Sequence, residues 1–266
     1  MEAALSCWCG KKDIITGSLI STELSDKRYD LSPRNNFRES KVIYGDEARQ
    51  YLEKHGRLDL FNLGYRKFKM IGDIIYHEHT SPTMFDFNEE TRDFLKISMV
   101  RNPFDLMVSY YWWNYFSPID DSVISFNREE LLAKKREREN VELAPSPEDT
   151  IRDLRVKFEK WLNIKAFVSQ QPRPAYGEET VARWFSSWSN EFFENDNIDF
   201  FIRFENINKD YEILCNHICK DPVEIPKFKS KIRKSEFSYQ DYYTCKTQKT
   251  IQQLFQSTID KFGYRF

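Results

Sequence analysis

Arg101 and Ser109 are residues whose types and spacing could bind an anion. A guanidinium group presents a planar fork of N–H donors to phosphate oxygens, and a serine hydroxyl adds another donor. Arg101 follows the apolar, β-prone run 97–100, and Asn102-Pro103 then opens a helix, because Asn is a favoured N-cap and Pro suits the first helical position. A cation at a strand end, the N–H groups of a helix start and a hydroxyl inside that helix together predict a site for a dianion. The alternatives are a structural ion pair of Arg101 and a Ser109 hydroxyl that bonds to the backbone of its own helix.

His77 and His79 form a second candidate group. In an extended segment the two imidazoles face the same side, while Glu78 faces the other. Imidazole titrates near neutral pH and can take a proton from a hydroxyl group. His79 is therefore the first candidate for a general base or acceptor contact, and His77 the second. The alternative, that each is a structural histidine, stays open.

A basic segment, residues 227–234, precedes Tyr239 and contains Lys231, Arg233 and Lys234. Cations next to aromatic rings suit a ligand that carries both a phosphate and an adenine. The alternative is a solvated basic loop.

The composition limits the kinds of partner. With 40 Lys and Arg against 42 Asp and Glu the net charge is −2, so no overall field draws the chain to nucleic acid, and any anion site must be local. Hydrophobic residues at 40% and charged residues at 31% are ordinary for a globular protein, and 266 residues can form a single domain. The aromatic content is 16%, and these side chains can fill the core, stack on an adenine or a sugar, or do both.

The five cysteines are an odd number without a metal-knuckle spacing, which indicates reduced thiols and a cytoplasmic protein. Cys215, His217 and Cys219 fall on one expected helix, where His217 points away from the two thiols, so we predict no metal site. The sequence has no run of 18 apolar residues and no signal-peptide pattern, so we expect no membrane-spanning segment.

Capping residues and hydrophobic periodicity predict an alternation of helices and strands. The expected helices are 46–54, 83–94, 103–116, 150–162, 178–188, 205–219 and 244–262, the expected strands are 73–77, 95–100 and 198–204, and residues 11–44 are mostly loop. This order indicates an α/β fold with a mainly parallel central sheet. Ligands of such sheets bind beyond the carboxyl ends of the strands, which is where Arg101 lies.

A charged helical excursion is expected at about 127–165 within a single domain, 1–266. Its first part, 128–139, alternates acidic and basic residues, which is typical of a solvated helix face. A lid, or a wall against which an acceptor binds, is the alternative.

Four segments, taken in chain order, resemble the Golgi-type carbohydrate sulfotransferase superfamily, including its bacterial and viral members. These enzymes use 3′-phosphoadenylyl sulfate. The similar segments span nearly the whole chain and are 9–16, 76–81, 101–113, and 198–207 together with the ending 239–243 and 262–266.

The resemblance implies a P-loop-like three-layer fold and transfer of a sulfuryl group to the hydroxyl of a carbohydrate or related acceptor. It implies that Arg101 and Ser109 bind the 3′-phosphate of the co-substrate and that the basic segment 227–234 closes over the nucleotide. His79, with His77 beside it, is then the candidate base, and the reaction requires no metal.

One part of the family pattern has no counterpart here. The family's first strand leads into a loop of the type Pro-Lys-x-x-Gly-Thr-Ser that cradles the 5′-phosphosulfate, whereas this chain starts at what resembles the helix after that loop. The segment that contains Lys11, Lys12 and Gly17-Ser18 is a poor substitute for that loop. Gly17 is also not followed by the lysine that a P-loop kinase has in its Walker motif. Either the true start lies upstream, or this is a truncated, catalytically inactive protein that binds a nucleotide or a partner.

Overall fold

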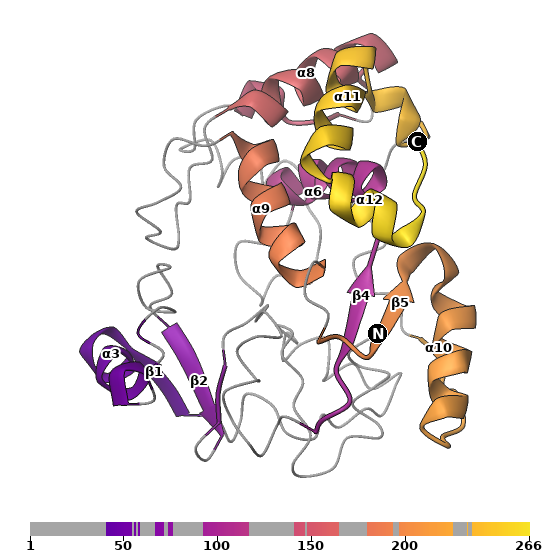
Figure 1. The fold of residues 1–266 in the computed structure, drawn as a ribbon. Helices are drawn as coiled ribbons and strands as arrows, with labels where there is room; N and C mark the ends of the chain where they lie inside the picture. Colours follow the sequence, from indigo (N-terminus) through magenta and orange to yellow (C-terminus); the bar gives the residue numbers. More distant parts are fainter. Residues whose placement is uncertain are drawn as a thin grey trace.

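The computed structural model describes the greater part of the chain from residue 41 to the last residue. The described residues are 41–54, 56, 58, 67–71, 74–76, 93–116, 141–146, 148–164, 180–193, 197–225, 233 and 236–266. They form a mixed α/β structure that is mostly helical and contains a small two-strand parallel sheet (Figure 1).

The parallel sheet consists of β4 (Ile97–Val100) and β5 (Phe200–Arg203), paired from Ile97 opposite Phe200 to Val100 opposite Arg203. The prediction of these two strands and of their parallel pairing is confirmed. A helix follows each strand: α6 (Pro103–Phe116) follows β4, and η3 (Phe204–Asn206) and α10 (Ile207–His217) follow β5. Both strands therefore end at the same edge of the sheet, and the residues that follow them meet there.

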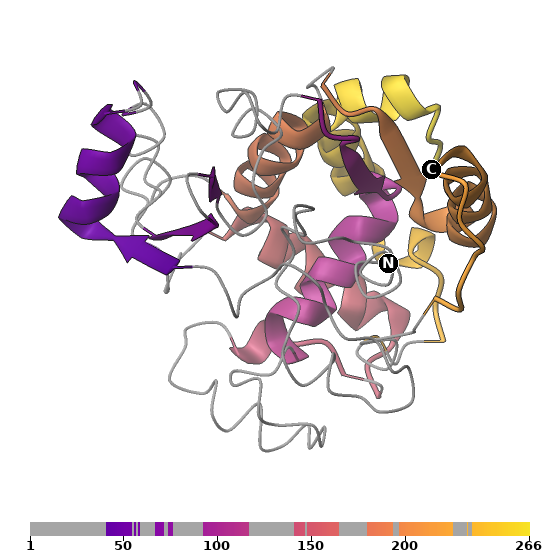
Figure 2. The same cartoon turned by 90° about the horizontal axis from the view of Figure 1, so that it is seen from below.

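A second sheet is antiparallel and has the order β1-β2-β3. Its strands are β1 (Lys41–Tyr44), β2 (Lys67–Ile71) and β3 (Ile74–Tyr76). Helix α3 (Gly45–Lys54) packs on β1 and β2, and lies with them to one side of the helical body in both views (Figures 1 and 2). The expected strand at 73–77 and the helix at 46–54 are confirmed, but the strand pairs antiparallel with β2, whereas the sequence predicts a mainly parallel sheet. The loop expected through residue 44 is wrong for 41–44, where a β-prone run pairs with β2.

The main core surrounds α6, which is apolar on all sides and is covered accordingly. The elements that pack around it are η2 (Val141–Leu143), α8 (Ile151–Asn163), α9 (Val181–Phe193), η4 (Gln240–Tyr242), α11 (Cys245–Leu254) and α12 (Gln256–Phe262). Among the described residues no helix combines the length and the apolar character that a membrane span needs.

Helix α8 is a core helix, although it lies in the range 127–165 where the sequence predicts a charged excursion. Its capping box joins Thr150 and Asp153, and the apolar residues of its pattern are buried as predicted: Leu154, Phe158, Trp161 and Leu162. The charged run 128–139 lies outside the described residues.

The C-terminal helix predicted over 244–262 consists of two helices. Thr244 caps α11, Gly263 ends α12 with a φ of 66°, and the break falls at Phe255, with φ −113° and ψ 22°. Phe255 is fully buried against the core. Tertiary packing therefore decides the break, while the local capping signals at the two ends are read correctly from the sequence.

Candidate functional site

Arg101 lies just beyond the carboxyl end of β4, between that strand and α6. Its guanidinium carbon stands 4.1 Å from the ring centroid of Phe204, the first residue after β5. The Phe204 side chain is exposed and offers its ring face to the cation. The parallel pairing of β4 and β5 is what brings these two strand ends together.

Helix α6 supplies two partners of Arg101, one and two turns along. Arg101 Nη1 donates to Ser109 Oγ at 3.1 Å, and Nε donates to Asp105 Oδ2 at 2.6 Å. Nη2 also lies 2.5 Å from Asp105 Oδ2. Residues four apart on a helix share a face, so the start of α6 places the carboxylate and the hydroxyl in line with the guanidinium group. The structure thus brings the two predicted anion-binding residues into contact, and it also gives Arg101 the ion pair that is the structural alternative.

Arg233, the described residue of the basic segment, also lies beside Asp105. Its Nη1 donates to Asp105 Oδ1 at 2.8 Å, its Nη2 donates to the carbonyl oxygen of Phe237 at 3.1 Å, and its guanidinium carbon lies 5.6 Å from the ring centroid of Tyr242. The carboxylate of Asp105 therefore bridges two guanidinium groups. We call Arg101, Asp105, Ser109 and Arg233 the anion cluster.

The anion cluster carries two cations and one carboxylate, a formal charge of +1. Arg101 has five N–H groups: Nε and one N–H of Nη1 donate to described residues, and Nη2 makes an ion-pair contact with Asp105. Counted against the described residues, each Nη keeps a donor for an oxygen of a phosphate, sulfate or carboxylate. The cluster can therefore bind a tetrahedral oxyanion.

Asn102 caps α6 as predicted, with Oδ1 accepting from the Phe104 N–H at 3.1 Å. Its own N–H donates to Glu205 Oε1 at 2.6 Å, and its Nδ2 donates to the carbonyl oxygen of Arg265 at 3.0 Å. These N–H groups at the helix start are used within the protein. Anion binding at this corner consequently depends on the guanidinium and hydroxyl groups more than on the backbone donors that the sequence analysis invoked.

Arg203 and Glu205 make structural interactions. Arg203 Nε and Nη2 each donate to the Asp210 carboxylate at 2.8 Å, and these bonds lower the pKa of Asp210. Glu205 Oε2 accepts from the Tyr264 hydroxyl at 3.2 Å, while burial, with Glu205 adding to it, raises the pKa of Tyr264.

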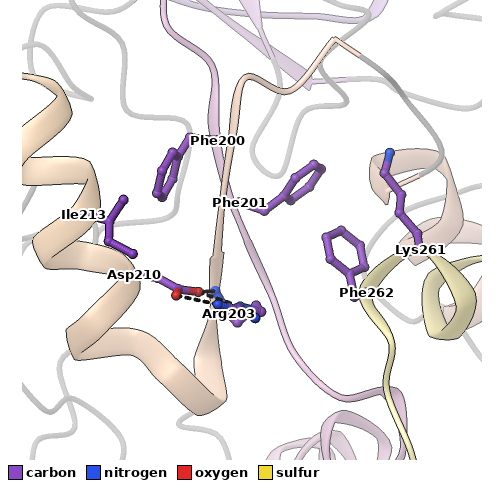
Figure 3. A pocket seen from close by; sticks show the side chains of 7 residues that line it. All are labelled: Phe200, Phe201, Arg203, Asp210, Ile213, Lys261 and Phe262. Atoms are coloured by element: carbon purple, nitrogen blue, oxygen red, sulfur yellow. Dashed lines mark hydrogen bonds and ion pairs between the residues drawn. The ribbon is translucent and has the colours of Figure 1, made fainter.

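A surface hollow of about 370 Å³ lies beside β5 (Figure 3). Its lining consists of Phe200, Phe201, Arg203, Asp210, Ile213, Lys261 and Phe262. Figure 3 shows Arg203 and Asp210 turned toward each other, so their charges satisfy one another. The hollow includes none of the anion cluster, and we do not assign it to the predicted site.

Several predicted residues lie outside the described part of the chain: His77, His79, Lys231 and Lys234. The structure therefore brings Arg101, Ser109 and Arg233 together, and the roles of all seven residues stay predictions. Asp105 is the member of the cluster that the sequence analysis missed. Its position four residues after Arg101 is the spacing of a helical ion pair and could have indicated it.

Comparison of the chain with protein-family models, with curated proteins and with solved structures found no match. The case for a function therefore depends on the chain's own residues and their geometry.

Proposed function

We propose that this chain is a sulfotransferase-like protein that binds 3′-phosphoadenylyl sulfate and transfers its sulfuryl group to a hydroxyl of a carbohydrate or related acceptor. The observation that carries the proposal is the convergence of Arg101, Ser109 and Arg233 beyond the carboxyl ends of β4 and β5. A site at this edge is where ligands of parallel α/β sheets bind.

In this proposal Arg101 and Ser109 hold the 3′-phosphate, and Arg233 covers the nucleotide together with Lys231 and Lys234. The parallel pair β4-β5 belongs to the sheet of a P-loop-like three-layer domain. The ring of Phe204, stacked on Arg101, screens one side of the guanidinium group from water and strengthens its attraction for an anion.

The chemical step would be an in-line displacement at sulfur. A bond forms between the acceptor oxygen and sulfur while the bond from sulfur to the bridging phosphate oxygen breaks, and 3′,5′-adenosine bisphosphate leaves. The hydroxyl proton passes to a general base, for which His79 is the first candidate and His77 the second. The scheme requires no metal.

Nucleotide binding without transfer is the second candidate function. It needs only the 3′-phosphate site that Arg101, Ser109 and Arg233 could form, and none of the residues that the transfer itself would require. Both candidates share the 3′-phosphate site and differ only in turnover.

The binding test compares 3′,5′-adenosine bisphosphate with 5′-AMP by isothermal titration calorimetry. Since a charge-assisted hydrogen bond contributes about 1.5–3 kcal/mol, we expect Arg101→Ala to weaken bisphosphate binding by roughly 10- to 100-fold and to leave 5′-AMP binding nearly unchanged. Arg49→Ala, on the exposed face of α3, is the matched control and should bind like the unchanged protein. Equal affinities of Arg101→Ala and the unchanged protein for the bisphosphate would refute the site.

Transfer is tested separately with ³⁵S-labelled co-substrate and a panel of carbohydrates. Labelled product that is lost in His79→Ala supports the enzyme. Binding of the bisphosphate without labelled product supports the second candidate.

A further inference from the structure

Asp105 holds the two guanidinium groups of the anion cluster by its two different oxygens. Oδ2 accepts from Arg101, and Oδ1 accepts from Arg233 at 2.8 Å. The carboxylate is largely buried, with 17% of its side chain exposed, and it stands in the first turn of α6. Its backbone is therefore fixed by the helix.

The two cations reach this carboxylate from different parts of the chain. Arg101 is one turn away from Asp105, whereas Arg233 is 128 residues further along. Two guanidinium groups that approach the same point repel each other unless an anion lies between them. Asp105 is that anion, and it ties the described part of the basic segment to α6.

Asp105 also decides which donors of Arg101 are left for a ligand. It takes the Nε and Nη2 side of the guanidinium group, while Ser109 takes an N–H of Nη1. Counted against the described residues, a donor remains on each Nη for the oxygens of an anion. A guanidinium group already held in this orientation loses less conformational freedom on binding.

We propose that Asp105 is a positioning residue of the 3′-phosphate site: its carboxylate fixes Arg101 and Arg233 so that their free N–H groups converge on the phosphate. The proposal rests on the proposed function for the identity of the ligand. The alternative is that Asp105 occupies the place of the phosphate and must be displaced. The two hypotheses predict opposite effects of removing the Asp105 charge on the affinity for the 3′-phosphate.

The test measures the 3′-phosphate increment, which we define as the Kd for 5′-AMP divided by the Kd for 3′,5′-adenosine bisphosphate. We expect Asp105→Asn to reduce this ratio about tenfold while the Kd for 5′-AMP stays within twofold, and Asp105→Glu, which keeps the charge, to retain more of the ratio than Asn does. Asp260→Asn, an exposed aspartate on α12, is the control and should leave the ratio unchanged.

Two outcomes of this titration would overturn the proposal. A ratio that rises in Asp105→Asn identifies a displaced competitor, and a parallel weakening of both nucleotides identifies a merely structural residue.

A second measurement does not need the nucleotide. Urea unfolding of Asp105→Asn, Arg233→Gln and the double variant should show non-additive midpoint shifts, because either single change breaks the same ion pair. Additive shifts would overturn the proposal. If the unchanged protein does not bind the bisphosphate, the proposed function fails, and this cycle then decides alone whether Asp105 fixes Arg233.

Discussion

Two aspartates are paired with arginine in different ways, and the difference separates a neutral ion pair from a cluster with an excess positive charge. Asp210 accepts from Nε and Nη2 of a single arginine, Arg203, and also from its backbone N–H, so the charges cancel. Asp105 accepts from Arg101 and Arg233 and leaves one positive charge in excess. An excess charge with donors to spare is what an anionic ligand requires.

The stability of the protein in acid tests the ion pair between Asp210 and Arg203. Its side chain is 4% exposed, and the bonds from Arg203 lower its pKa. A carboxyl group whose pKa is lower in the folded chain contributes stability above its unfolded pKa of about 3.9, and that contribution is lost as the pH falls through the folded value. We therefore expect Asp210→Asn to destabilise the protein at pH 7 and to flatten the fall of its unfolding free energy below about pH 4, as measured by urea unfolding. An acid limb as steep as that of the unchanged protein would contradict this role.

The individual site residues were partly predictable from the sequence. Arg101 and Ser109 follow from residue type and local spacing, because both lie on one strand–helix unit. That Arg233 and Asp105 meet could not be predicted, since the contact joins positions 128 residues apart and depends on how the chain folds back onto α6.

At the scale of the helices and strands, the predictable boundaries are those set by local hydrogen bonds. Helix α6 begins after the Asn102 cap, α8 begins after Thr150, and α12 ends at a left-handed Gly263. The boundaries that were predicted wrongly are those set by contacts between distant segments of the chain. Strand β1 exists because it pairs with β2, whose residues 67–71 carried no strand prediction, and the break at Phe255 follows the core.

The cap of α8 provides a prediction at this scale. Thr150 Oγ1 accepts from the Asp153 N–H at 3.2 Å, and the Asp153 carboxylate accepts from the Thr150 N–H at 3.1 Å. Thr150→Ala removes half of this capping box and should lower the free energy of unfolding by about 1 kcal/mol, measured by urea denaturation. Thr250→Ala, at a partly exposed threonine inside α11, is the control and should change it by less than about 0.5 kcal/mol. The same cost at both positions would mean that the capping box contributes no more than an ordinary surface hydroxyl.

At the scale of the whole molecule, the C-terminal residues hold the corner that carries Arg101. The carbonyl oxygen of Arg265 accepts from Asn102 Nδ2, and the Tyr264 hydroxyl donates to Glu205, which in turn accepts the N–H of Asn102. The Phe266 ring packs edge-on against Phe104 at 5.0 Å between centroids. The start of α6, the end of β5 and the C-terminal residues therefore form one interlinked unit beside the anion cluster.

Asn102→Ala tests this unit, and Thr150→Ala is its reference because both changes remove a helix N-cap. Asn102 is 7% exposed, so its loss leaves the Arg265 carbonyl oxygen without that donor as well as the helix without its cap. The net contribution of one hydrogen bond is about 0.5–1.5 kcal/mol and adds to that of the cap, so we expect a total loss of about 1.5–3 kcal/mol in the free energy of unfolding. The same variant should weaken 3′,5′-adenosine bisphosphate binding, since Arg101 adjoins the disturbed turn. A loss no larger than that of Thr150→Ala would show that the cap acts within α6 alone, and the anion cluster would then depend on α6 without support from the C-terminal residues.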